Sequence, residues 1–273
     1  MSLSQEPAFS YLKQNFITGY KDITGEEYAG VSGVHMPTGN AVATSNGAGP
    51  HNLQTFILAP DGTVMHCLPG YWNPDDLVSE LELGQDMYKV WTNKSLTRAQ
   101  KDEQFRLRQH HHLVSHSPQT VRRSRMQSFD QKFEAKNRLT TSDTILDSSL
   151  ARVVLEKGEK APFGAFKTTD QIMHDRMQQR PFLPYQSFDV VAFTDYGRPF
   201  YNKNEDQRTA TGEVNKDLAK SQTLMGNTAG MRRGRRARMA NGGMAQPGPS
   251  AGAGYFASRG IKTFVRTGLR VMR

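Results

Sequence analysis

The chain has few cysteines, no long apolar run and a modest share of hydrophobic residues. Cys67 is the single cysteine among 273 residues, which excludes an intramolecular disulfide and leaves the redox compartment open. No apolar run approaches the roughly 20 residues that a membrane-spanning helix needs. Hydrophobic residues make up 36% of the chain and mean hydropathy is -0.64, which is lean for two full cores. We therefore expect one modest core with long polar extensions.

The first residues carry no visible targeting signal. Residues 1–6 lack both a basic segment and the apolar segment that follows it in a signal peptide. We therefore expect a cytoplasmic protein by default.

Charge is concentrated at the C-terminal end. Residues 231–273 hold ten Lys or Arg and no Asp or Glu, so the formal net charge of +9 belongs to this tail and residues 1–230 are close to neutral. This asymmetry favours a role for the tail in binding an acidic surface.

Residues 54–92 show the clearest structural pattern. An apolar, β-branched run from Gln54 ends at the turn signal 60–62, and a second run over 63–68 predicts the returning strand of a hairpin. Pro69 and Gly70 end that strand. Asn73 then provides a helix cap, followed by a proline and two aspartates, and apolar residues recur at helical spacing to about residue 91. A strand, turn, strand, helix order follows.

The first third of the chain resembles the thioredoxin superfamily. Residues 7–23 read as a short helix leading into a strand, and the hairpin and helix described above follow it in the order of that family. The resemblance covers about residues 6–92 and implies an α/β fold with a partial or degenerate thioredoxin-like domain. A long helical or extended and partly disordered C-terminal region follows it.

The catalytic features of that family are missing. The resemblance implies a C-x-x-C motif, because a helix N-terminus activates one thiol and a second thiol resolves the mixed disulfide. Cys67 lies instead inside the second hairpin strand. The family's cis-proline should fall near Gln54, but Pro50 lies four residues earlier. Either the domain is redox-inactive and serves binding, or a first strand and a C-x-x-C helix lie upstream of Met1. In both cases the given residues lack a central strand.

The remaining chain divides by composition. A thioredoxin-like domain over 1–95 leads to a polar helical extension, a wrapping segment rich in aromatics and proline, a low-complexity linker and a basic amphipathic tail. The tail's apolar and basic residues interleave at helical spacing, although Gly260 and Gly268 weaken a helix. The polar helical extension covers 96–137, the wrapping segment 138–201, the low-complexity linker 202–254 and the basic amphipathic tail 255–273.

Two groups of residues are candidates for partner binding. Aromatic side chains spaced along a proline-punctuated segment pack either on their own domain or on a partner. The arginine run over 232–238 either contacts phosphates or another polyanion, or is a solvated segment. The candidates are Phe182, Tyr185, Tyr196, Phe200 and Tyr201 in the first group, and Arg232, Arg233, Arg235, Arg236 and Arg238 in the second.

Histidines offer one candidate metal site. His112 and His116 stand four residues apart on one predicted helical face, after His110 and His111. Because no cysteine or close carboxylate completes a ligand shell in the sequence, we interpret these residues as a solvated polar run. His66 and Cys67 are neighbours in a strand, so their side chains face opposite sides and do not form a nucleophile and base pair. We therefore assign no catalytic, cofactor-binding or metal-binding residue and expect no cofactor.

The sequence thus predicts a non-catalytic, thioredoxin-like binding or assembly protein, tethered to an acidic partner by its C-terminal arm. One alternative is a thiol-disulfide oxidoreductase whose C-x-x-C half is missing from the given start. The other is attachment to a nucleic acid or an anionic membrane through residues 231–273. No small-molecule substrate is evident.

Overall fold

The computed structural model describes residues 2–32, 44–158, 161–201 and 261–267. The chain divides into two units, and the smaller one, residues 32–42 and 202–258, lies almost wholly outside the described residues. The account below concerns the larger unit. It is a mixed structure of helices and strands, as the sequence predicts.

The N-terminal third follows the predicted order of elements. A short 3-10 helix, η1 (Ser2–Ser4), precedes helix α1 (Ala8–Asn15), which leads directly into strand β1 (Phe16–Asp22). Strands β3 (Gln54–Leu58) and β4 (Val64–Pro69) form the antiparallel hairpin around Gly62, and helix α2 (Pro74–Thr92) closes the unit. Gly62 has a φ of 85°, the left-handed conformation that the turn requires.

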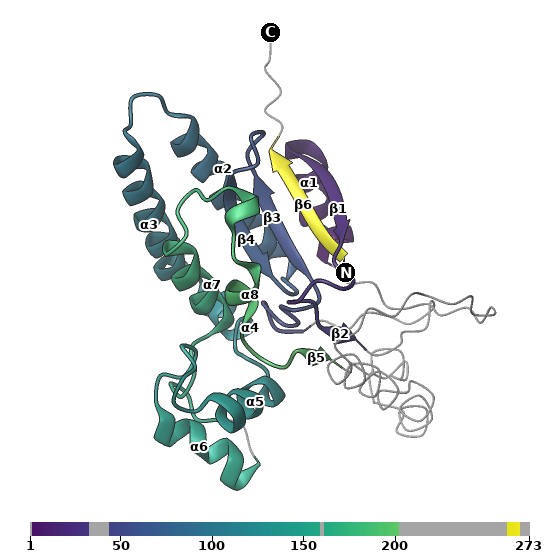
Figure 1. Ribbon diagram of the computed structural model, residues 1–273, viewed down its shortest axis with the longest axis vertical. Coiled ribbons are helices and arrows are strands. Elements are labelled where there is room, and N and C mark those ends of the chain that lie inside the picture. The colour runs from purple at the N-terminus through teal and green to yellow at the C-terminus, as the bar shows by residue number, and fades with distance from the viewer. Residues whose placement is uncertain (1, 33–43, 159–160, 202–260, 268–273) are drawn as a thin grey trace, which may run out of the picture. The chain divides into compact units, whose positions relative to one another are not determined.

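The main sheet has four strands in the order β1-β6-β3-β4 (Figure 1). Strand β6 (Ile261–Thr267) pairs antiparallel with β1 and parallel with β3. It thus lies between β1 and β3, although it comes from the C-terminal end of the chain. The helical pattern expected over 255–273 is wrong for residues 261–267, because Ile261, Thr263 and Val265 are β-branched and favour a strand.

Further helices follow α2 along the chain. Two short strands, β2 (Val31–Ser32) and β5 (Phe200–Tyr201), pair with each other. Figure 1 shows α3 and α7 next to each other, with α5 and α6 forming a separate helical pair. The bounds are α3 (Arg98–Ser115), α4 (Pro118–Arg123), α5 (Ser128–Arg138), α6 (Ser148–Lys157), α7 (Thr169–Gln178), η2 (Tyr185–Ser187) and α8 (Val190–Thr194).

Two apolar clusters form the core. The larger cluster joins the sheet to α1, α2 and the segment around α8, and the smaller one joins α5, α6 and α7 around Ala151 and Ile172. Helix α2 packs closely on β3 because Gly84 has no side chain. A Cβ at position 84 would lie 2.4 Å from Ile57 Cδ1. This close approach fixes the position of α2 and of the side chains one turn before Gly84.

Candidate metal centre

Helix α2 brings a carboxylate into the protein interior. The helix begins at Pro74, where the Asn73 side chain accepts a hydrogen bond from the backbone N–H of Asp75. Asp76 and Glu80 stand four residues apart, so they lie on one face of the helix, and both are buried. Asp76 is held by Arg123 and by other donors. Glu80 faces a group of imidazoles instead.

Three histidines from two other helices face Glu80. His112 lies in the last turn of α3, His116 is the residue that caps this helix, and His174 lies in the middle of α7. The ring centroids of His112 and His116 are 4.9 Å apart, and His174 lies 5.4 Å and 5.3 Å from them. Helices far apart in the sequence therefore bring one carboxylate and three imidazoles together.

The ligand atoms have the spacing of a metal site. Glu80 Oε1 lies 3.4 Å from His112 Nε2, 3.2 Å from His116 Nε2 and 3.4 Å from His174 Nε2. All four candidate ligand atoms lie within 4.8 Å of one another. Ligands placed about 2.0–2.1 Å from a zinc ion at the corners of a tetrahedron are about 3.3 Å apart. The three edges that start at Glu80 fit this value.

The three ring nitrogens form no hydrogen bond with the described residues and approach only Glu80. They are the Nε2 atoms of His112, His116 and His174, and all three are buried. Buried polar atoms in proteins almost always have a partner, so each unpartnered atom requires an explanation. A cation at the centre of the group would give all three nitrogens a partner at once.

Residues behind the ligands orient two of the three rings. His116 Nδ1 lies 2.9 Å from Asp170 Oδ2, and His174 Nδ1 lies 2.6 Å from Gln109 Oε1. Both partners accept a hydrogen bond, so the proton of each ring belongs on Nδ1. In the neutral form of each ring the lone pair is then on Nε2, which faces the centre of the group. Outer partners of this kind are typical of metal-binding histidines.

The charges of the group suit a divalent cation. Complete burial alone would raise the pKa of Glu80, but His174, followed by His112 and His116, holds that pKa well below its ordinary value. Burial lowers the pKa of His174 and favours its neutral form. Burial acts in the same direction on His116, but Asp170 and Glu80 outweigh it and raise the His116 pKa to about 10. A cation bound at His116 Nε2 would therefore have to displace a proton from that ring.

His112 is the ligand nearest to solvent. Its side chain is 17% exposed, whereas the other three ligands are almost completely buried. His112 also lines a pocket of about 290 Å³, together with Asp86, Arg108 and His111 among others. An ion would reach the centre from this side.

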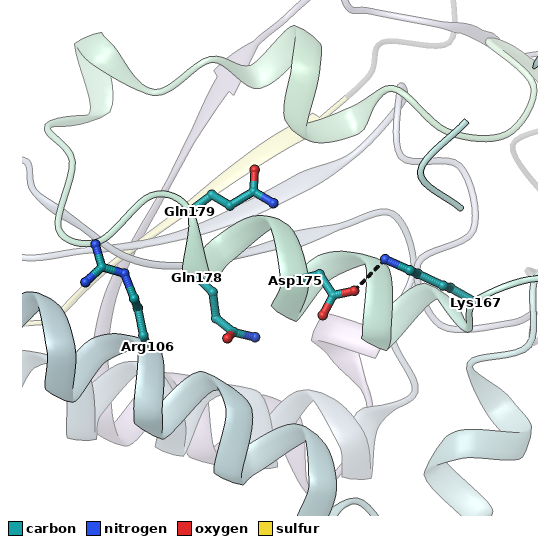
Figure 2. A pocket seen from close by; sticks show the side chains of 5 residues that line it. All are labelled: Arg106, Lys167, Asp175, Gln178 and Gln179. Carbon is teal, nitrogen blue, oxygen red and sulfur yellow. Dashed lines mark hydrogen bonds and ion pairs between the residues drawn. The ribbon is translucent and has the colours of Figure 1, made fainter. Parts of the chain in front are cut away.

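A second pocket, of about 480 Å³, lies between α3 and α7 (Figure 2). Arg106, Gln178 and Gln179 line it with Lys167 and Asp175, whose side chains form an ion pair with Nζ and Oδ2 2.7 Å apart. None of the four candidate ligands lines this pocket, so it does not belong to the metal centre.

The structure changes the interpretation of the histidine run. His110 and His111 are exposed, as expected of a solvated polar run, but His112 and His116 face inward. The interpretation of these two residues as solvated is wrong, because their side chains are only 17% and 5% exposed. They lie beside Glu80 and His174, which the spacing in the sequence does not show. His66 and Cys67 do face opposite sides of β4. His66 contacts Glu80, while Cys67 pairs across the hairpin with Phe56 on the other face.

The aromatic candidates lie partly in the core. Phe182 and Tyr196 are buried in the chain's own core, as the own-domain alternative expects, and Tyr185 packs against Phe56. Phe200 and Tyr201 form strand β5. Partner binding stays a prediction for Tyr185, Phe200 and Tyr201. The arginine candidates between 232 and 238 lie outside the described residues.

The two candidate ligands that sequence reasoning missed, Glu80 and His174, each had a signal in the sequence. Glu80 falls on the face of α2 that carries Leu77 and Leu81, and a carboxylate on an apolar face requires a partner. Asp170 and His174 repeat on α7 the four-residue spacing of His112 and His116. Neither signal identifies which helix faces which, so the ligand group becomes visible only in three dimensions.

The chain matches no protein-family model, no curated protein and no solved structure. Among the described helices, none has the length and apolar character that crossing a membrane requires.

Proposed function

We propose that this protein binds one divalent transition-metal ion through Glu80, His112, His116 and His174. The observation that carries the proposal is the convergence of three buried, unpartnered Nε2 atoms on one buried carboxylate oxygen. Imidazole and carboxylate donors without a thiolate suit Zn²⁺, Fe²⁺, Co²⁺ or Ni²⁺ better than Cu⁺. Zinc is the first ion to test.

A tetrahedral ion in this group has protein atoms at all four positions. Catalytic zinc sites keep one position open for water or substrate, whereas closed sites hold the fold together. The four donors come from α2, α3 and α7, so the ion would link α3 and α7 to α2. We therefore propose a structural or metal-binding role for this centre.

The metal content of the full chain tests this proposal. Protein purified without added metal or chelator is expected to contain about one equivalent of a transition metal by elemental analysis. The His112→Ala variant should contain much less, because one of four ligands is gone. His110→Ala is the matched control, since His110 is an exposed histidine of the same helix, and it should keep the wild-type content. Wild-type protein without metal, and unable to take up zinc, would contradict the proposal.

The finer fold assignment is also our proposal. We propose that α1, β1, the β3–β4 hairpin and α2 form a degenerate thioredoxin-like domain that serves binding and assembly. The order of these elements along the chain supports it. A crystal structure in which these elements superimpose poorly on thioredoxin-like domains would contradict it.

The charge asymmetry favours a second function. We propose that the basic C-terminal arm tethers the metal-binding unit to an acidic partner protein. Substitution of the five arginines between 232 and 238 by glutamine should weaken capture of the full chain on an acidic matrix at low salt. Equal retention of both proteins would contradict this role, and loss of RNA or anionic-vesicle binding instead would favour the nucleic-acid or membrane alternative.

A further inference from the structure

We infer that Gln109 is a positioning residue of the metal centre, and that it acts with His66 to orient two ligands at once. This inference rests on the proposed metal-binding function. Neither Gln109 nor His66 is a ligand in our assignment, yet both are completely buried beside the group. The inference concerns what these two side chains do for Glu80 and His174.

A chain of hydrogen bonds links the two ligands. His66 Nε2 lies 2.9 Å from Glu80 Oε2, the carboxylate oxygen that does not face the three imidazoles. Gln109 Nε2 lies 3.3 Å from His66 Nδ1, and Gln109 Oε1 lies 2.6 Å from His174 Nδ1. The order is therefore Glu80, His66, Gln109, His174, and an ion held by Glu80 and His174 would close it into a ring.

Only one assignment of donors and acceptors is consistent with all of these hydrogen bonds. The ionised Glu80 only accepts hydrogen bonds, so the proton of a neutral His66 ring must lie on Nε2. His66 Nδ1 is then an acceptor, and the amide nitrogen of Gln109 donates to it. The amide oxygen of Gln109 faces the other way and accepts from His174 Nδ1–H. His174 Nε2 is consequently left with its lone pair toward the metal position.

Glutamine is suited to this position because its side chain has a donor end and an acceptor end. A carboxylate at position 109 would accept from His174 but would have no proton for His66. His66 would then turn its single proton toward position 109 and leave Glu80, or carry two protons and add a positive charge to the centre. Gln109 also fixes His174 without a further negative charge beside Glu80 and Asp170.

The packing leaves no substitute for these contacts. The rings of His66 and His174 are stacked, with centroids 5.6 Å apart and an interplanar angle of 21°. His66, Gln109 and His174 are all fully buried. Because water does not reach these atoms, a lost hydrogen bond is not replaced from solvent. A substitution at Gln109 should therefore change the orientation of both the Glu80 and the His174 side chains.

Cobalt titration of the full chain, stripped of metal, tests the inference. Co²⁺ serves as the probe because its visible absorption spectrum reports the coordination geometry as well as the affinity. We expect wild-type protein to bind one equivalent. Gln109→Glu, which keeps the shape and removes the donor, should bind Co²⁺ about 10–100 times more weakly and with a changed spectrum, as outer-partner mutations typically do.

Two further variants make the result unambiguous. Gln109→Leu removes both hydrogen bonds without adding charge and keeps most of the volume, so it should also weaken binding and change the spectrum. Gln179→Glu is the matched control, because it makes the same chemical change at an exposed residue just beyond the end of α7 (Figure 2). It should retain the wild-type affinity and spectrum. Circular dichroism of the metal-free variants verifies that each is folded.

The outcomes separate the two proposals. Wild-type protein that binds no Co²⁺ contradicts the proposed function itself. Wild-type protein that binds one equivalent, together with position-109 variants of unchanged affinity and spectrum, contradicts the positioning role alone. The positioning role is supported if both position-109 variants bind Co²⁺ more weakly than wild-type protein and with an altered spectrum, while Gln179→Glu behaves like wild-type protein.

Discussion

Loss of one metal ligand should remove the response of protein stability to zinc. His112→Ala is the most informative change, because His112 is the most exposed ligand and its removal disturbs packing least. In wild-type protein, an ion that binds only the folded state shifts the unfolding equilibrium by RT ln(1 + [L]/Kd). The variant retains three donors and should respond far less at the same zinc concentration.

The expected shift follows from the ratio of free zinc to Kd and from the size of the fold. Free zinc at 100 times Kd stabilises the folded protein by about 2.7 kcal/mol. For a domain of about 150–250 residues, each kcal/mol raises the unfolding temperature by about 2–4 °C. Wild-type protein should therefore melt about 5–11 °C higher with zinc than with a chelator. The ion would be held in part by three buried nitrogens that form no hydrogen bond with the described residues.

Scanning calorimetry or fluorescence melting, with and without zinc, measures this shift. His110→Ala should respond like wild-type protein, because His110 is exposed and is not one of the four candidate ligands. An unchanged wild-type melting temperature in zinc would refute the reasoning. So would a His112→Ala variant with the full wild-type shift, since zinc would then act at another place.

Three other predictions concern the framework of the centre. Asp76→Asn should lower the free energy of unfolding by about 1.5–3 kcal/mol at pH 7 in urea titrations, because the Asp76 carboxylate accepts two hydrogen bonds from Arg123. Burial opposes the ionised form of Asp76, but Arg123 and other donors lower its pKa. The stabilisation is therefore present above about pH 4 and is lost as pH falls through the lowered pKa. A wild-type minus Asp76→Asn difference in unfolding free energy that is the same at pH 7 and pH 2 would contradict the assignment. Arg176→Lys should cost about 2 kcal/mol by the same titration, since lysine cannot reproduce the paired hydrogen bonds to Asp143, and an unchanged midpoint would argue against them. Cys67 should react with a thiol reagent only after unfolding because it is fully buried, and rapid reaction of the folded protein would show that β4 opens.

Local patterns in the sequence predict the N-terminal third well. The turn at 60–62, the cap at Asn73 and the apolar spacing of α2 each depend on neighbouring residues, and the structure confirms the elements they predict. Strand β6 shows the limit of this reasoning. Its apolar and basic residues alternate in a way that fits a helix or a strand, and pairing with β1 and β3 decides between them.

The candidate metal centre is only half visible in the sequence. The spacing of His112 and His116 indicates a shared face, because both belong to one helix. Glu80 and His174 are 32 residues before His112 and 58 residues after His116, and no local rule connects them. Their meeting depends on the packing of α2, α3 and α7 against one another. Gln109 is likewise an ordinary helix residue until its two partners are known.

X-ray absorption spectroscopy at the zinc edge, on the full chain loaded with one equivalent, tests the central claim most directly. Our account predicts four nitrogen or oxygen neighbours at about 2.0–2.1 Å, with the outer-shell scattering of three imidazole rings and no sulfur neighbour at about 2.3 Å. Loss of one imidazole contribution in His112→Ala should follow. A zinc ion surrounded by six oxygens, or by sulfur from Cys67, would contradict the account.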